Sequence, residues 1–285
     1  MLKLLSLPAE QDPMPLSRHL WKAKLGHRIL PDEQGNHVFW LLDVGQLPLV
    51  QQALDDWQAG RSTVPATNNP NALIFRIKKV PVTVLVLLLA CLITAAFEWV
   101  FGAIVFLLIS FTPMEFVDNQ LVSLPLSTTL SSGQWWRLIT PIFLHFGIMH
   151  LVFNALWIWI LGEMIERNQG QVKLVLLILF TALISNSAQF LINDSSQFGG
   201  LSGVVYGYLG YIWLWSKLHP QQGLAINNGL VIFMLGWMLL GMTDFSRSLL
   251  GLNMANEAHL GGLLAGLAFA LLPWFKKKAS KKTSI

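Results

Sequence analysis

Long apolar runs separated by short polar stretches fill the chain from residue 80 to residue 275. Runs of this kind are typical of helices that cross a bilayer, because about 20 apolar residues span the hydrocarbon core. Polar residues interrupt several of the runs, which favours helices that line an interior over helices that face only lipid. The pattern predicts an all-α membrane domain with six spans. The predicted spans are Val80–Trp99, Leu151–Ile165, Leu174–Ile192, Ser202–Trp215, Ala225–Met242 and Ala258–Trp274.

The N-terminal part of the chain has the shorter patterns of a soluble domain. Leu16–Leu25 has helical spacing, and Pro48 opens a second helix. Between them, His27–Leu30 and His37–Leu42 flank a turn-rich loop, which is typical of a β-hairpin. These patterns predict a small α+β domain. The predicted divisions of the chain are this domain at 1–61, a linker at 62–79, the membrane domain at 80–275 and a basic tail at 276–285.

A long segment, residues 100–145, separates the first two predicted spans. Its beginning, Val100–Phe111, is apolar enough to enter the membrane interface, but the charged Glu115 follows soon after. Such a segment is better interpreted as interfacial helices than as a seventh span. Within it, Trp135-Trp136-Arg137 brings together two aromatic rings and a cation, a combination typical of anchoring at the lipid headgroups.

Composition excludes a soluble globular protein, because 54% of the 285 residues are hydrophobic, only 12% are charged and the mean hydropathy is +0.55. Eleven Lys and Arg residues of the membrane part lie on one side of the predicted bundle, against Arg137 and Arg247 on the other. By the positive-inside rule the richer side is cytoplasmic, so both termini are predicted to be cytoplasmic. The eleven are Arg76, Lys78, Lys79, Arg167, Lys173, Lys217 and the lysines at 276, 277, 278, 281 and 282.

Charge and cysteine content indicate which binding partners, disulfides and metal sites are to be expected. The net charge of +4 is explained by anchoring beside the anionic lipid of a bilayer, so no nucleic-acid partner is expected. Met1–Glu10 lacks the basic n-region and the cleavage site of a secretory signal. The single cysteine, Cys91, lies inside the first predicted span, which leaves no intramolecular disulfide and no two-cysteine metal site. We expect neither a metal ion nor a cofactor.

One short apolar helix carries a candidate nucleophile, Ser202. Its apolar part, Leu201–Trp215, would be about 22 Å long, which is less than the roughly 30 Å of the hydrocarbon core. If Lys217 anchors the cytoplasmic end, Ser202 lies below the outer membrane surface. It then occupies a helix N-terminus, where backbone N–H groups have no intrahelical partners. Irregular backbone at that depth is tolerated only inside protein or beside water.

The last predicted span offers a base at the same depth. His259 lies near its outer end, with Gly262 and Gly266 on the same face. Both helices run inward from the outer side, so a close contact between their glycine faces would bring Ser202 and His259 together as a nucleophile–base pair. The alternative is that these glycines serve helix packing alone. The glycine face of the Ser202 helix consists of Gly203, Gly207 and Gly210.

Other intramembrane chemistries fit the sequence less well. A zinc protease would carry HExxH, which is absent, and His145 and His150 are five apart without a carboxylate ligand. An aspartyl pair needs two aspartates in the membrane, but Asp118, Asp194 and Asp244 fall in predicted loops. A transporter would also use polar residues and broken helices, yet here the polar residues cluster at the outer end and no internal repeat is evident. Serine chemistry is therefore favoured.

Four motifs together resemble those of the rhomboid intramembrane serine proteases. They occur in the order of that family, on corresponding spans, and the resemblance covers all six predicted spans. The N-terminal α+β domain is similar to that of bacterial rhomboids of the GlpG type. The motifs are Gly200-Leu201-Ser202-Gly203, His150-xxx-Asn154, Ala258-His259-xx-Gly262 and Trp136-Arg137.

The resemblance implies a role for each residue that matches a family motif. Ser202 would be the nucleophile and His259 the general base, without a third member. His150, Asn154 and the backbone N–H of Ser202 would form the oxyanion hole. Tyr206, one turn after the serine, would pack against the imidazole.

For function, the resemblance implies an intramembrane endopeptidase of a bacterial inner membrane, acting on the transmembrane segments of single- or multi-span membrane proteins. The substrate would come in from the side, between the second and fifth spans, where Phe153 and Trp237 are bulky candidates for a gate. The alternative is a catalytically inactive rhomboid-like module that binds membrane proteins. Its signature would be the loss of Ser202 or His259, and both are present. We make no prediction of the oligomeric state.

Overall fold

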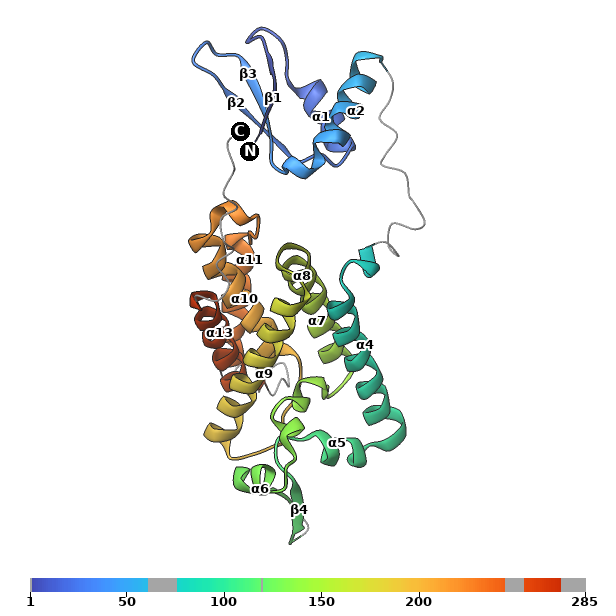
Figure 1. Cartoon of the computed structure of the whole chain (residues 1–285), viewed down its shortest axis with the longest axis vertical. Helices are drawn as coiled ribbons and strands as arrows, with labels where there is room; N and C mark the ends of the chain where they lie inside the picture. Colours follow the sequence, from blue (N-terminus) through green and yellow to red (C-terminus); the bar gives the residue numbers. More distant parts are fainter. Residues whose placement is uncertain (1, 61–75, 119, 244–253, 273–285) are drawn as a thin grey trace, which may run out of the picture. The chain divides into compact units, whose positions relative to one another are not determined.

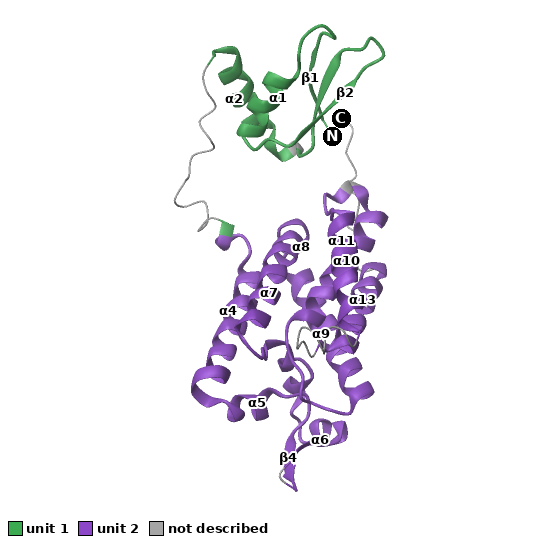
Figure 2. Cartoon of the chain, turned by 180° about the vertical axis from the view of Figure 1, so that it is seen from behind, with its two compact units in different colours: residues 1–76 green, residues 77–285 purple. Residues whose placement is uncertain are grey.

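The computed structural model describes residues 2–60, 76–118, 120–243 and 254–272. The chain divides into two compact units, Met1–Arg76 and Ile77–Ile285 (Figure 1, Figure 2). The division falls within the linker predicted at 62–79. The basic tail predicted at 276–285 lies outside the described residues.

The N-terminal unit is the α+β fold that the sequence predicts. Its three-stranded antiparallel sheet has the order β1-β3-β2. Side chains from the sheet and both helices form one core, in which Leu20, Phe39 and Leu41 are fully buried. The elements are β1 (Leu2–Leu7), α1 (Met14–Lys22), β2 (His27–Pro31), β3 (His37–Leu41), the short 3-10 helix η1 (Val44–Gln46) and α2 (Leu47–Gln58).

Strand β1 is the strand of this unit that the sequence pattern misses. Its register against β3 shifts between Lys3 and Leu5. An irregularity of this kind interrupts the alternation of inward and outward side chains, which is the signal by which a strand is recognised. The predicted hairpin has no such interruption, since β2 and β3 pair residue by residue from His27 opposite Leu41 to Pro31 opposite His37.

The membrane unit has a helical segment at each of the six predicted spans. Among the described residues, three of them are long and apolar enough to cross a membrane: Pro81–Phe101, Ile148–Gln169 and Gln171–Asn193. The other three, α10, α11 and α13, have 17, 14 and 16 residues. Six complete spans stay a prediction. The segments are α4 (Pro81–Ala95) with π-helical η2 (Ala96–Phe101), α7 (Ile148–Trp157) with π-helical η5 (Ile158–Gly162) and α8 (Glu163–Gln169), α9 (Gln171–Asn193), α10 (Ser202–Leu218) with η6 (Pro220–Gln222) behind it, α11 (Asn228–Gly241) and α13 (Asn256–Leu271).

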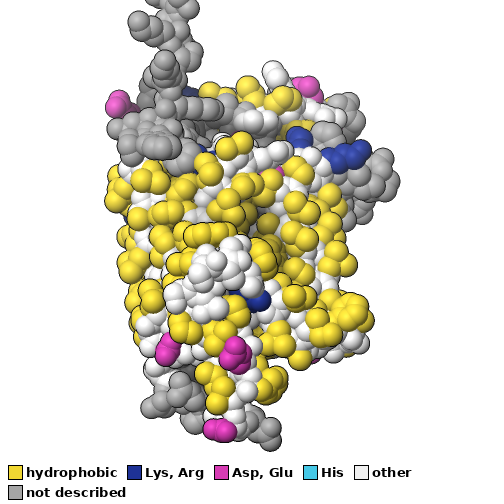
Figure 3. Space-filling model, turned by 60° about the horizontal axis from the view of Figure 1, so that its bottom comes forward, with side chains coloured by type: hydrophobic (Ala, Val, Ile, Leu, Met, Phe, Trp, Pro, Cys, Tyr) yellow, Lys and Arg dark blue, Asp and Glu magenta, His cyan; other side chains and the backbone are white. Residues whose placement is uncertain are grey.

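The surface of this unit is that of a protein surrounded by lipid. Apolar side chains cover most of the face seen in Figure 3. Leu92 of α4 is 65% exposed and Ile232 of α11 is 70% exposed, which water would penalise and a hydrocarbon environment would not. The interior is filled by one large apolar cluster to which α10 contributes throughout its length.

The segment between the first two spans contains the predicted helices and also a β-hairpin that the sequence does not predict. Its elements gather at one end of the bundle in both views (Figure 1, Figure 2). The turn of the hairpin includes Asp118 at a φ of 49°, a conformation that aspartate tolerates better than most residues. The elements are α5 (Ala103–Ile109), β4 (Met114–Val117), β5 (Gln120–Ser123), α6 (Leu126–Ser131) and the 3-10 helices η3 (Trp135–Leu138) and η4 (Thr140–Phe143).

Arg137 makes contacts that the sequence does not predict, while its depth at headgroup level stays a prediction. The side chain is buried within the protein. Its Nη1 donates to the carbonyl oxygens of Leu107 and Ser110, at 2.8 and 3.0 Å, and its Nε donates to Gln134 at 2.6 Å. A guanidinium suits this position because it offers several donors to the unpaired carbonyls at the end of α5. Arg137 thus ties α5 to the segment that leads into the site.

Candidate active site

Helices α10 and α13 meet at direct backbone contact. A Cβ added to Gly262 would lie 1.9 Å from the carbonyl oxygen of Gly203, and one added to Gly266 would lie 1.9 Å from that of Gly207. No side chain fits at Gly262 or Gly266, so these two glycines permit the approach of α13 to the backbone of α10. A Cβ added to Gly203 or Gly207 would instead lie against Ser185 or Thr181 of α9. The glycine contact predicted from the sequence is confirmed. We refer to Gly203, Gly207, Gly262 and Gly266 as the glycine seam.

The glycine seam places Ser202 beside His259. Ser202 is the first residue of α10, and His259 lies in the first turn of α13 with 6% of its surface exposed. The distance between His259 Nε2 and Ser202 Oγ is 2.9 Å, which is within hydrogen-bonding range. A neutral imidazole with its proton on Nδ1 can accept the serine proton in this geometry.

The ring of Tyr206 packs against the face of the His259 imidazole. The ring of Tyr206 lies 4.8 Å from it between centroids, at an interplanar angle of 37°. The Tyr206 hydroxyl donates to the carbonyl oxygen of Met234 on α11, at 3.0 Å. Nδ1 of His259 is buried and has no hydrogen-bond partner among the described residues. Within that part of the chain, the arrangement is a serine–histidine pair without the carboxylate of a triad.

The loop that leads into Ser202 passes close to α7. Gly200 has a φ of +116°, a conformation that favours glycine. A Cβ added to Gly200 would lie 2.8 Å from Nε2 of His150 and 3.5 Å from Nδ2 of Asn154. These two side chains, one turn apart on α7, therefore lie beside the backbone that precedes the serine. The first N–H groups of α10 add donors that have no partner within the helix. The structure thus gathers the residues predicted for an oxyanion hole.

His145 connects the same loop to the segment before α7. It is fully buried, its Nε2 accepts the Leu201 N–H at 3.4 Å, and its Nδ1 lies 3.2 Å from the Phe143 carbonyl oxygen. This geometry indicates a structural role for His145. Its ring lies 5.1 Å from that of His150. Among the described residues, however, no group of three or more His, Cys, Asp or Glu side chains could hold a metal ion.

Polar side chains on α9 tie this helix to the start of α13 and to the segment before α7. Oε1 of Gln189 accepts the N–H of Ala258 at 3.0 Å, in the first turn of α13 and next to His259. Nδ2 of Asn186 donates to the Leu138 carbonyl oxygen at 2.9 Å. The sequence shows polar residues near this end of the helix but not their partners, which are 69 and 48 positions away in the chain.

The side chains predicted as a gate lie on the expected helices. Phe153 of α7 is 54% exposed and Trp237 of α11 is 39% exposed. A ring contact between the two helices joins Trp157 and Phe233 instead, with centroids 6.5 Å apart. Each of these residues is one helical turn from its predicted counterpart. A search for further aromatic residues at i±4 would have found them.

Comparison with known proteins gives a consistent result. Residues 132–274 match the family model described as the rhomboid domain. The chain is 32% identical over 274 residues to the rhomboid protease GlpG of Yersinia enterocolitica, covering 90% of each chain. It is 34% identical over 259 residues to the rhomboid protease GlpG of Photorhabdus laumondii, covering 85% of this chain and 84% of the relative. With the rhomboid protease GlpG of Salmonella newport it shares 44% over 137 residues, 48% of each chain.

Proposed function

The chain belongs to the rhomboid family, and from that premise we propose that it is an intramembrane serine protease with Ser202 as the nucleophile and His259 as the general base. The observation that carries this assignment is the 2.9 Å distance between Ser202 Oγ and His259 Nε2. A serine is a weak nucleophile at neutral pH unless a base within hydrogen-bonding reach removes its proton. The glycine seam holds the two helix ends at that distance.

The reaction proceeds in two halves. Nε2 of His259 takes the proton of Ser202 while Oγ attacks the carbonyl carbon of the scissile peptide bond. The imidazolium returns the proton to the leaving amine, which breaks the C–N bond and leaves an ester on Ser202. Water then attacks that ester with His259 again as base, which releases the new carboxyl end and restores the serine.

Three groups are proposed to stabilise the negative oxygen of the tetrahedral intermediate. They are the side chains of His150 and Asn154 and the backbone N–H of Ser202. The close approach of both side chains to Gly200 supports this assignment, because it puts them next to the backbone of the nucleophile. Donors fixed in a water-poor site stabilise developing charge at little cost of reorganisation.

The proposed substrate is a transmembrane segment of a single- or multi-span membrane protein. A helix hides its carbonyl groups in its own hydrogen bonds, so the segment has to unwind locally before Ser202 can attack. We propose that it comes in between α7 and α11, past Phe153 and Trp237. The exposure of both side chains supports this route.

We propose a multi-pass orientation with both termini in the cytoplasm and the active site toward the outer side of a bacterial inner membrane. The distribution of Lys and Arg supports this orientation. Its physical consequence is that Ser202 and His259 lie near the outer water layer, from which the water needed for hydrolysis is supplied.

A catalytically inactive rhomboid-like protein that only binds membrane clients is the alternative function. It would have no reason to keep a serine hydroxyl and an imidazole at hydrogen-bonding distance in a glycine seam. Both side chains are present and are 2.9 Å apart. The protease is therefore the function that the site supports best.

The test is cleavage of a single-span substrate by the purified protein in detergent and in liposomes. Ser202→Ala is the diagnostic variant. Ser216→Ala is a matched control, since Ser216 lies on the same helix near its other end and its hydroxyl donates only to the Trp213 carbonyl among the described residues. Cleavage by the wild type and by Ser216→Ala, but not by Ser202→Ala, is expected. Equal cleavage by Ser202→Ala would overturn the assignment.

A further inference from the structure

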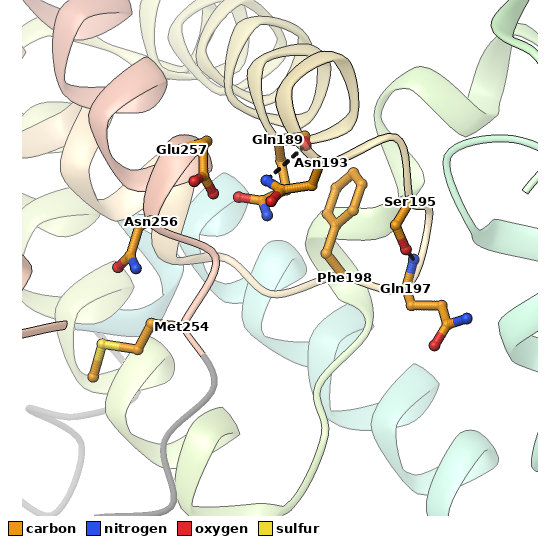
Figure 4. A pocket seen from close by; sticks show the side chains of 8 residues that line it. All are labelled: Gln189, Asn193, Ser195, Gln197, Phe198, Met254, Asn256 and Glu257. Carbon is orange, nitrogen blue, oxygen red and sulfur yellow. Dashed lines mark hydrogen bonds between the residues drawn. The ribbon is translucent and has the colours of Figure 1, made fainter. Parts of the chain in front are cut away.

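A pocket of about 180 Å³ lies beside the serine–histidine pair, and none of the residues that line it is assigned a catalytic role above (Figure 4). Gln189 and Asn193, at the end of α9, form one part of its wall. Phe198, in the loop that leads to Ser202, forms another, and Glu257, two residues before His259, a third. The walls of the pocket are thus the segments that position the nucleophile and the base. A peptide that reaches Ser202 from the outer side is therefore expected to come near this pocket.

The lining combines one charged group with neutral polar groups. Glu257 carries the charge among the residues that line the pocket. Figure 4 shows its carboxylate and the amides of Gln189 and Asn193 facing the same space. Nδ2 of Asn193 donates to the Gln189 carbonyl oxygen at 3.2 Å, so its Oδ1 is left to accept. Phe198 adds an aromatic ring.

Gln189 gives an independent indication that the pocket takes a ligand. The side chain is 8% exposed, and its Oε1 is occupied by the Ala258 N–H. Its Nε2 has no hydrogen-bond partner among the described residues, and Figure 4 shows the amide directed into the pocket. A largely buried amide with a free donor is costly unless something in the pocket accepts from it.

The presence of Glu257 at this position has a simpler explanation, but that explanation does not account for the other groups that line the pocket. A carboxylate in the first turn of α13 is stabilised by the partial positive charge of the helix N-terminus. That effect explains why an acidic residue is tolerated there. It does not account for the free amide donor or for the aromatic ring that faces the same pocket.

We propose that this pocket is a subsite for a Lys or Arg side chain of the substrate, a few residues to the outer side of the scissile bond. The inference rests on the proposed protease function and names a substrate class for it. The Glu257 carboxylate pairs with the cation, Oδ1 of Asn193 accepts a further N–H, and the Phe198 ring offers its negative face. Nε2 of Gln189 donates to a main-chain carbonyl of the same substrate segment.

Such a subsite would discriminate well among membrane proteins. Lys and Arg are depleted on the outer side of transmembrane segments by the positive-inside rule. A basic residue just outside a span is therefore an uncommon feature, and a carboxylate that selects it would restrict cleavage to a small set of segments. The Glu257 carboxylate would also repel an acidic side chain at the same position of a substrate.

The experiment varies the charge on both partners. A single-span substrate carries Lys, Gln or Glu at each position just outside the scissile bond, and kcat/KM is measured with the cleaved bond confirmed by mass spectrometry. We expect the wild type to prefer Lys over Gln about fivefold at one or two positions, since a partly exposed ion pair contributes about that much. Glu257→Gln should bring the ratio to about one. Glu257→Lys should reverse the order, so that the Glu substrate is cut faster than the Lys substrate.

Glu115→Gln is the matched control, because Glu115 is an exposed carboxylate on β4 that loses the same charge outside the pocket. It should keep the wild-type preference. Ser202-dependent cleavage with equal rates for Lys, Gln and Glu at every position would overturn the subsite and leave the protease function standing. An unchanged preference in Glu257→Gln would do the same. Absence of Ser202-dependent cleavage for the whole substrate set would overturn the protease function and the subsite with it.

Discussion

The helices on the two sides of the active site pack in different ways, one side through backbone contact and the other through side chains. On one side, α10 and α13 touch at the glycine seam, where an added Cβ would lie 1.9 Å from a carbonyl oxygen. On the other side, α11 buries a single stripe of Val231, Met234, Met238 and Gly241. A Cβ added to Gly236 of α11 would meet no atom within 4 Å.

The difference assigns separate tasks to the two sides. The contact at the glycine seam involves no side-chain rotamers, so backbone geometry sets the distance between the helix ends that carry Ser202 and His259. The α11 side depends on side chains such as the ring pair Trp157 and Phe233, which can rotate. Movement that admits a substrate is therefore expected at α11, since it costs least where few buried contacts are lost.

The largest expected effect on the cleavage rate comes from removing the side chain of Ser202 or of His259. Ser202→Ala and His259→Ala should each lower the cleavage rate to background, a loss of about 10⁴–10⁶-fold, because neither residue activates anything without the other. The double variant should be no slower than either single one. A double variant that is much slower than both would show that the two residues act independently. Single-turnover kinetics on folded protein, with Ser216→Ala alongside, makes the measurement.

The oxyanion donors should have the next largest effect. Asn154→Ala and His150→Ala each remove one donor and leave the Ser202 N–H in place, so the rate should fall about 10²–10³-fold. Substrate affinity should barely change, because the lost interaction belongs to the transition state. Both variants should still react with a fluorophosphonate, more slowly than the wild type. Wild-type cleavage by Asn154→Ala would make that residue a structural group between helices.

The seam itself can be opened with one methyl group. Gly262→Ala places a Cβ against the Gly203 carbonyl, so the helices have to separate by an ångström or more. A displacement of that size at a reacting pair costs about 10²-fold in rate. Gly236→Ala on α11 is the matched control, and it should keep its activity, with a thermal midpoint equal to or above that of the wild type, because Ala favours a helix over Gly by about 1 kcal/mol. Equal activity in both variants would contradict the distinction between the two sides.

A smaller effect is expected at the gate. Trp157→Ala removes the ring contact with Phe233, so opening of α11 becomes easier and kcat/KM should rise about two- to tenfold, the range that an aromatic pair contributes. Phe233→Ala should do the same, and the double variant should add nothing further. Trp213→Ala, a partly exposed tryptophan on α10, should leave the rate unchanged. A fall in rate for the gate variants would mean that the pair holds the substrate and does not restrict it.

The smallest effect is expected from the thiol. Cys91 is exposed on α4, a helix that carries none of the proposed catalytic residues. Cys91→Ala should cleave within experimental error of the wild type, and alkylating reagents should not inhibit. Strong inhibition by alkylation that Cys91→Ala abolishes would argue against serine chemistry.

Much of the membrane unit could be predicted because its signals are local. The positions of the helices follow from apolar runs, and the pairing of α10 with α13 follows from glycines at helical spacing on both. Ser202 and His259 were matched because each lies in the first turn of a helix whose glycine face needs a partner. A glycine lacks a Cβ wherever it occurs, so the sequence alone shows where another backbone can approach closely.

Several parts of the site were decided only by the tertiary structure. The bond from Gln189 to Ala258, the support of Leu201 by His145 and the ring pair of Trp157 and Phe233 each join helices or loops far apart in the chain. The residue pattern of Leu2–Leu7 likewise does not predict strand β1, whose register is irregular. Periodicity records which face of an element is apolar, whereas the partner of a given side chain depends on how distant elements pack. The sequence by itself therefore determined the helices and the predicted pair, and the packing of α7, α9 and α11 around them decided the surroundings of that pair.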